Sequence, residues 1–120
     1  MAFKPLVRLL DGTTTGGTTI PSDSCQLLSV ELVDVASGAF LFATEDTVID
    51  FKVSGPSTAE PALLYANVSD SCMTAITSVT LSKGHNASNL ALKSLVTGTV
   101  TIISSSKQAT ADGILTLAVE

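Results

Sequence analysis

Residues 46–53 decide the class of fold, and they read Asp46-Thr47-Val48-Ile49-Asp50-Phe51-Lys52-Val53. Thr or apolar residues occupy every second position from Thr47, while Asp50 and Lys52 stand between them. Successive side chains of a β-strand point to opposite faces of its sheet, so a period of two predicts a strand with one buried face. Thr and Val also favour the pleated surface of a sheet. This stretch therefore predicts a half-buried strand.

The same alternation recurs along most of the chain. Polar turn residues separate the runs, and one of these turns, Ser37-Gly38, predicts a tight hairpin. We predict about seven or eight strands, at residues 4–10, 26–35, 39–43, 46–53, 62–68, 73–82, 95–103 and 114–119. Short strands joined by polar turns are typical of an all-β fold, and we expect an antiparallel β-sandwich or a small β-barrel.

One segment departs from the period of two. Small and apolar residues recur there at helical spacing, as at Ala87, Leu90 and Ala91. Asn86 or Ser88 has a side chain suited to capping the start of a helix. We therefore predict one short helix near residues 87–95.

The chain has 120 residues and no segment that resembles a linker, so we predict a single β-domain over residues 1–120. The polar, glycine-containing stretch after Asp11 favours an extended N-terminal arm at residues 1–20. Lys4 and Pro5 interrupt the first apolar run before it reaches the length of a signal peptide. No later run approaches a membrane span. We therefore expect a chain made and kept in a cytosol, without contact with a membrane, unless a leader was removed.

The two cysteines, Cys25 and Cys72, each end the same tetrapeptide, Ser-Asp-Ser-Cys. Ser and Asp favour turns, so the repeat predicts two similar turns that enter two strands. Two cysteines alone do not make a zinc site. Thiols stay reduced in a cytosol, so we predict two buried, unbridged cysteines, with a disulfide as the alternative.

The composition excludes several classes of protein. Apolar residues make up 45% of the chain, which argues against intrinsic disorder. Only 14% of residues are charged and the net charge is −5, whereas a nucleic-acid surface needs clustered Lys and Arg. With few charged residues and with 15 Ser and 16 Thr, much of the surface must consist of Ser, Thr, Ala and Gly. Surfaces of such low charge suit permanent contact with neighbouring molecules.

The chain contains few side chains that are suited to catalysis or to binding a metal or a cofactor. His85, the single imidazole, lies in a predicted turn and is expected to be an ordinary exposed loop histidine. Glu45, Asp46 and Asp50 form the densest acidic cluster, which predicts a solvated strand face, with a weak cation site as the alternative. The glycines within residues 12–17 match no phosphate-binding loop. We therefore expect no enzyme, and no catalytic, cofactor-binding or metal-binding residue.

Over its whole length, the chain resembles the cement or decoration proteins of tailed-bacteriophage capsids. The resemblance lies in its length, its acidic charge, its Thr- and Ser-rich composition and the regular spacing of its predicted strands. No motif carries this resemblance, so no residue role transfers from the family. The resemblance implies a protein on the exterior of the virion, made in the host cytoplasm, that stabilises the lattice of the major capsid protein. It also implies a homo-oligomer, with a trimer favoured, and no bound nucleic acid.

Such a protein needs contacts with its lattice. The N-terminal arm and the Ser54–Pro61 loop are the longest irregular segments with apolar residues at their margins. We expect lattice contacts from Phe3, Lys4, Arg8, Pro56 and Pro61.

Two alternatives remain open from the sequence. One is the self-assembling coat protein of a small RNA phage, although such a protein is expected to carry basic residues on the sheet face that binds RNA. The other is a subunit of an extracellular filament or a surface-binding module, for which a removed leader and a disulfide are expected.

Overall fold

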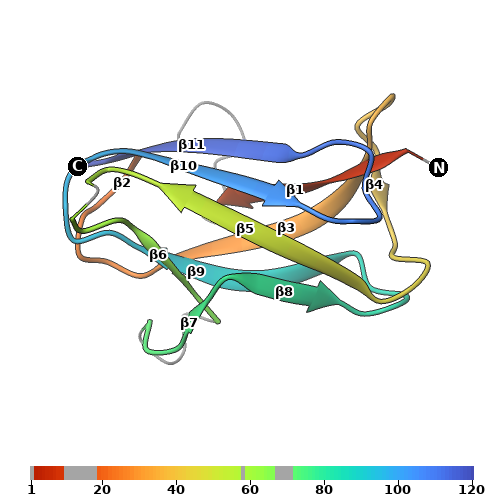
Figure 1. Ribbon diagram of the computed structural model, residues 1–120, viewed down its shortest axis with the longest axis horizontal. Helices are drawn as coiled ribbons and strands as arrows, with labels where there is room; N and C mark the ends of the chain where they lie inside the picture. Colours follow the sequence, from red (N-terminus) through yellow and green to blue (C-terminus); the bar gives the residue numbers. More distant parts are fainter. Residues whose placement is uncertain (1, 10–18, 58, 67–71) are drawn as a thin grey trace.

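The protein folds into two β-sheets packed face to face, as the computed structural model shows (Figure 1). The structure describes residues 2–9, 19–57, 59–66 and 72–120. The first sheet has the strand order β1 (Phe3–Leu9), β3 (Gln26–Asp34), β9 (Ala87–Lys93), β6 (Leu63–Tyr65) and β7 (Ala75–Ile76), with β4 (Phe40–Leu41) paired to β3. The second sheet has the order β2 (Thr19–Ile20), β11 (Gly113–Val119), β10 (Gly98–Ser105), β5 (Thr47–Ser54) and β8 (Ser78–Leu81).

The strand order is that of an immunoglobulin-like sandwich. In the first sheet, β1-β3-β9-β6 follow the order A-B-E-D, and in the second, β5-β10-β11 follow C-F-G. β2 runs parallel to β11, and the other described strand pairs are antiparallel. The predicted all-β antiparallel sandwich is therefore confirmed.

Side chains on the inner faces of the two sheets form an aliphatic core. In β5, Ile49 is fully buried whereas Val48 and Asp50 are exposed, as the period of two predicts. The most deeply buried core residues are Leu28, Val30, Ile49, Leu90, Leu92, Val100, Ile102 and Leu117. Because these side chains fill the space between the sheets, the outer faces and the two ends of the sandwich are the surfaces available for function.

Residues 87–93 form β9 instead of the predicted helix. β9 pairs with β3 on one edge and with β6 on the other. Leu90 and Leu92 are both fully buried, and a separation of two residues is that of one strand face. Pairing with neighbouring strands on both edges stabilises residues 87–93 as a strand, and this stabilisation exceeds the local preference for a helix. Among the described residues, no helix has the length and apolar character that crossing a membrane requires.

The start of the chain belongs to the first sheet and not to a free arm. β1 pairs with β3 along its whole length, and Val7 and Leu9 are buried in the core. Thr19 and Ile20 pair with the end of β11. The predicted arm is therefore wrong for residues 3–9 and 19–20, and its residues 10–18 lie outside the described part of the chain.

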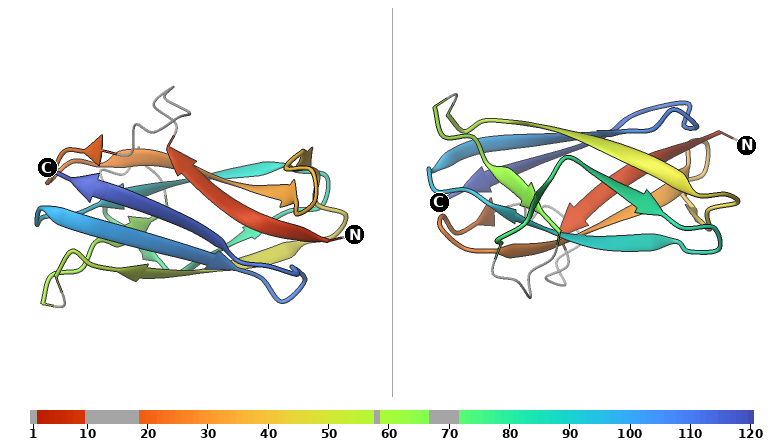
Figure 2. Two further views of the ribbon diagram at one scale, coloured as in Figure 1. Left: turned by 90° about the horizontal axis from the view of Figure 1, so that it is seen from above. Right: turned by 60° about the horizontal axis from the view of Figure 1, so that its bottom comes forward.

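Several other strands differ in extent from their predictions. The predicted strand 39–43 is β4 at Phe40–Leu41 only, and within the described part of 62–68 only Leu63–Tyr65 form a strand. The run 73–82 divides into β7 in the first sheet and β8 in the second, because the chain passes between the layers there (Figure 2). The run 95–103 starts only at Gly98. Before it, the side-chain Oγ of Ser94 donates to the carbonyl of Val96 over 2.7 Å, which bends the chain between β9 and β10.

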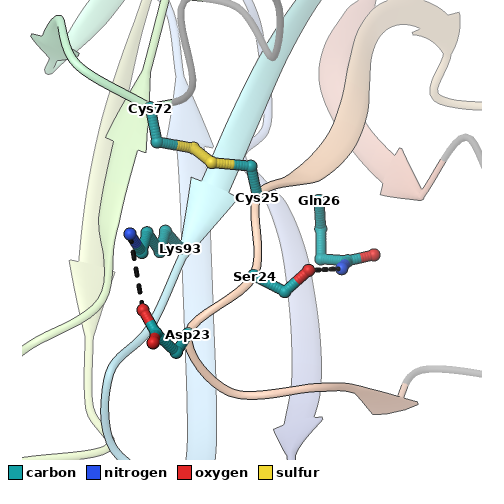
Figure 3. Close-up of a disulfide and its surroundings, with 6 residues drawn as sticks. All are labelled: Asp23, Ser24, Cys25, Gln26, Cys72 and Lys93. Atoms are coloured by element: carbon teal, nitrogen blue, oxygen red, sulfur yellow. Dashed lines mark hydrogen bonds and ion pairs between the residues drawn. A yellow bond between two sulfur atoms is a disulfide. The ribbon is translucent and has the colours of Figure 1, made fainter.

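Cys25 and Cys72 form a disulfide, so the prediction of unbridged thiols is wrong (Figure 3). Their Cα atoms lie 6.1 Å apart, within the usual range for this bond. The prediction failed because it assumed a reducing compartment, whereas the fold brings the residue before β3 next to the segment that leads to β7. The second Ser-Asp-Ser turn, at residues 69–71, lies outside the described residues.

Candidate functional site

The five predicted contact residues lie in three separate places. Phe3 begins β1 at one end of the sandwich, whereas Pro56 and Pro61 follow β5 at the opposite end (Figure 1). Lys4 and Arg8 point outward from the first sheet, because the positions that alternate with them in β1 are buried. The structure therefore does not bring these five residues into one site.

Arg8 is engaged within the chain. Its Nε donates to Oε1 of Glu31 over 2.7 Å, and its Cζ lies 5.5 Å from the centroid of the Phe40 ring. The Glu31 side chain is only 8% exposed, so this ion pair compensates a nearly buried carboxylate. The guanidinium also makes a cation–π contact that holds the Phe40 ring near the outer face of the first sheet.

The Ser37-Gly38 turn reverses the chain between β3 and β4, which confirms the predicted hairpin. The N–H of Gly38 donates to the carbonyl of Asp34 over 2.8 Å, and the N–H of Asp34 donates to the carbonyl of Ala39 over 2.8 Å. Gly38 has a φ of 76°, a conformation that glycine adopts at little cost. The turn therefore places residues 40–42 at one end of the sandwich.

Large apolar side chains are exposed along this hairpin. The exposed fractions are 45% for Val35, 56% for Phe40 and 65% for Phe42. Phe3 lines a pocket together with Phe42, so three of the four Phe residues of the chain lie at this end. The fourth, Phe51, packs against the core. Exposed apolar patches of this kind mark interaction sites on soluble domains.

A pocket of about 140 Å³ opens beside Phe42, and we call it the hairpin pocket. Leu32 and Ala43, which are buried, form its base. Its apolar walls are Phe3, Leu32, Leu41, Phe42 and Ala43, and its polar side consists of Thr44, Glu45, Thr47 and Gln108. The hairpin pocket thus combines an aromatic wall with one carboxylate.

Hydrogen bonds fix the polar side of the hairpin pocket. Nε2 of Gln108 donates to Oε1 of Glu45 over 3.3 Å and to the carbonyl of Asp46 over 3.1 Å. Oγ1 of Thr47 donates to the carbonyl of Glu45 over 3.0 Å. The carboxylate of Asp46 accepts the N–H of Lys83 over 2.9 Å. The Glu45 carboxylate is therefore held in place by the loop that joins β10 to β11.

Backbone hydrogen bonds tie the segments around the pocket to one another. The carbonyl of Phe3 accepts the N–H of Thr110 over 3.0 Å. The N–H of Ala43 donates to the carbonyl of His85, and the N–H of Gly84 donates to the carbonyl of Ala43, each over 2.8 Å. These bonds join the start of β1 to the loop between β10 and β11, and the segment after β4 to the turn between β8 and β9, so bonds within the chain shape the surroundings of the pocket.

The size and groups of the hairpin pocket limit its chemistry. Pockets for small-molecule ligands usually measure about 300–1,000 Å³, so this one accommodates a single side chain. Glu45 is the one ionisable side chain among its lining residues. Acid–base hydrolysis of glycosides uses two carboxyl groups, and nucleophilic catalysis uses a nucleophile beside a base. The lining residues provide a binding surface and neither of these arrangements.

The other sequence candidates lie near this end without forming a second site. His85 is exposed in the turn between β8 and β9, as predicted. Glu45 lines the pocket, the Asp46 carboxylate accepts the N–H of Lys83, and Asp50 points outward from β5. Within the described ranges, no three His, Cys, Asp or Glu side chains are grouped so that they can hold a metal ion.

Sequence reasoning missed Phe40 and Phe42. A signal was present, because residues 39–43 are five apolar residues in a row directly after the predicted turn. A strand with one solvent-facing side does not need apolar residues at every position. The exposed members of such a run therefore indicate an interaction surface.

No protein-family model and no curated protein matches the chain. Solved structures with a similar fold include a glycosyl hydrolase family 2 member from Bacteroides cellulosilyticus, with a TM-score of 0.61, 15% identity, and 98% of this chain and 14% of that chain covered. A conjugative transposon lipoprotein from Bacteroides eggerthii has a TM-score of 0.54 and 10% identity, with 98% of this chain and 96% of that chain covered. The D00-D0 domain of Intimin has a TM-score of 0.54 and 11% identity, with 98% of this chain and 45% of that chain covered.

At these identities, the likeness concerns the fold alone. The chain spans about one seventh of the hydrolase, so that match concerns one β-domain within a much longer protein.

Proposed function

We propose that the protein is a non-catalytic structural module that docks on a protein surface through the hairpin pocket. The observation that carries this proposal is Phe42, which is 65% exposed beside a pocket sized for one side chain. Binding energy at protein interfaces concentrates in a few aromatic or apolar anchors that fill pockets. Phe42 can therefore insert into the partner as an anchor, and the hairpin pocket can accept an apolar side chain of the partner.

The groups that line the pocket indicate the chemistry of its occupant. Leu32, Leu41 and Phe42 favour an apolar side chain. The Glu45 carboxylate at the polar side favours a neighbouring hydrogen-bond donor or a positive charge. A phosphate backbone would be repelled by this carboxylate and by the net charge of −5. The best occupant is therefore a leucine-like side chain from a protein, with a lysine or arginine nearby.

As the larger assembly we propose a virion, with the chain as an outer decoration protein on the lattice of the major capsid protein. The low content of charged residues supports a permanent contact, and the acidic charge supports a position away from packaged nucleic acid. The disulfide between Cys25 and Cys72 is compatible with an exterior position, because disulfides persist on virion surfaces.

A second candidate is a surface-binding module outside a cell. The disulfide favours it equally, because disulfides also persist on secreted and cell-surface proteins. Two of the structures with a similar fold are named as a lipoprotein and as a domain of Intimin. Both candidate functions use the hairpin pocket for docking, and they differ in the larger assembly to which the chain belongs.

Co-sedimentation with mature capsids that lack the protein tests the proposal. We expect the chain to pellet with the capsids, and Phe42→Ser to weaken this binding by about tenfold or more, as for an interface anchor. Leu95→Ser is the matched control, because Leu95 is 61% exposed and lies between β9 and β10 at the opposite end. Absence of binding to capsids would overturn the decoration role, and equal effects of the two substitutions would overturn docking through the hairpin pocket.

A further inference from the structure

The outer face of the second sheet carries few charges. Along β10 and β11, the outward positions hold Thr, Ser, Ala and Ile, whereas the inward positions are buried or, at Leu115, partly buried. Ile103 lies directly opposite Ile114 on one side and Lys52 on the other. Ile114 is 64% exposed and Val48 is 47% exposed. The face thus presents apolar and hydroxylic side chains to the solvent.

Asp50 and Lys52 are the charged residues within the strands of this sheet, and both point outward from β5. Among the described residues, the ion pairs are Arg8–Glu31 and Lys93–Asp23, so neither Asp50 nor Lys52 is ion-paired with another described residue. Lys107 borders the hollow next to Asp50 at the margin of the face. An acid and a base therefore stand two positions apart on an otherwise neutral surface.

We propose that this face is a two-fold interface between two copies of the chain. In a two-fold interface, if residue i contacts residue j, then residue j contacts residue i. When β5 of one copy lies antiparallel over β5 of the second, Asp50 stands opposite Lys52 of the second copy, and Lys52 stands opposite its Asp50. Two ion pairs then form by symmetry, and Ile103 and Ile114 are removed from water as in packed sheets.

The opposite outer face does not have this self-complementary character. Its Arg8 and Glu31 already pair within one copy. A second copy is therefore better matched to the second sheet than to the first. The dimer does not rest on the proposed docking function, but it adds to it. Antiparallel stacking would point the two hairpin pockets in opposite directions and leave both free, so a dimer could bind two sites with increased avidity.

Light scattering coupled to size-exclusion chromatography, run over a dilution series, tests the dimer. We expect a mass of twice the 12.3 kDa chain. Asp50→Lys and Lys52→Asp each place like charges opposite each other, and each should raise the dissociation constant of the dimer by about tenfold or more. The double variant Asp50→Lys/Lys52→Asp restores opposite charges across the axis, and it should recover the dimer.

Glu60→Lys is the control, since it reverses one exposed charge in the loop between β5 and β6 and should leave the dimer unchanged. Circular dichroism of each variant shows that it is folded. A monomer or a trimer of the unmodified chain overturns the proposal. It is also overturned if the folded double variant stays as dissociated as the single variants, because recovery by charge exchange is the result that a merely destabilised surface does not produce.

Discussion

Gln108 and Glu45 are 63 residues apart in the chain, and Nε2 of Gln108 donates to Oε1 of Glu45 over 3.3 Å. The same amide donates to the carbonyl of Asp46 over 3.1 Å. These two bonds join the loop between β10 and β11 to the loop between β4 and β5. They orient the one carboxylate that lines the hairpin pocket and fix the two loops to each other.

Gln108→Ala should weaken binding at the hairpin pocket, because the Glu45 carboxylate loses the donor that orients it. The free energy of unfolding should fall by only about 1–2 kcal/mol, as for the two exposed hydrogen bonds that Nε2 of Gln108 makes. Gln26→Ala is the control, because it removes the same side-chain amide away from the pocket, where Nε2 of Gln26 donates to Oγ of Ser24 over 2.8 Å. Urea unfolding and peptide titration measure the two effects. Equal loss of binding in both variants would show that Gln108 acts only through stability.

Replacement of Cys25 and Cys72 by Ser should lower the free energy of unfolding by about 4 kcal/mol, because the bond closes a loop of 47 positions. Urea unfolding of the double variant and of the oxidised chain measures the difference. A thiol titration of the denatured, unreduced protein should find no free thiol. Two free thiols per chain would contradict the disulfide.

Gly113→Ala should destabilise the sandwich where β1 approaches the second sheet. A Cβ atom at Gly113 would collide with the carbonyl oxygen of Pro5 and would crowd Oγ of Ser104. Backbone atoms cannot move aside easily, so we expect a loss of about 3 kcal/mol. Gly84→Ala is the comparison, because φ at Gly84 is 86° but the space around it is open.

Backbone strain alone should cost Gly84→Ala about 1 kcal/mol. Thermal unfolding of both variants tests the difference. A smaller loss for Gly113→Ala than for Gly84→Ala would contradict the close contact between β1 and β11.

The sandwich could be predicted because period-two patterns, such as that of residues 46–53, are long enough to define a buried face. The strands β2, β4 and β7 have two residues each, and so short a segment shows no period. β9 was missed because Ala87, Leu90 and Ala91 also fit a helix. Only pairing with β3 and β6, which involves distant residues, decides between the two structures.

The hairpin pocket could not be predicted from local patterns. Its lining residues Phe3, Phe42, Glu45 and Gln108 come from distant parts of the chain and meet only in the folded state. The predicted contacts were chosen from irregular segments, and only Phe3 among them lines this pocket. The disulfide was missed for a different reason, since residue spacing does not reveal the redox environment in which a chain folds.

Amide chemical shifts during titration with a short peptide test docking through the hairpin pocket most directly. The peptide carries one leucine flanked by lysines, which matches the apolar walls and the Glu45 carboxylate. We predict shifts concentrated at residues 41–47 and 106–110, lost in Phe42→Ala and kept in Leu95→Ala. Shifts spread over the whole surface, centred on the opposite end, or unchanged by Phe42→Ala would contradict the account.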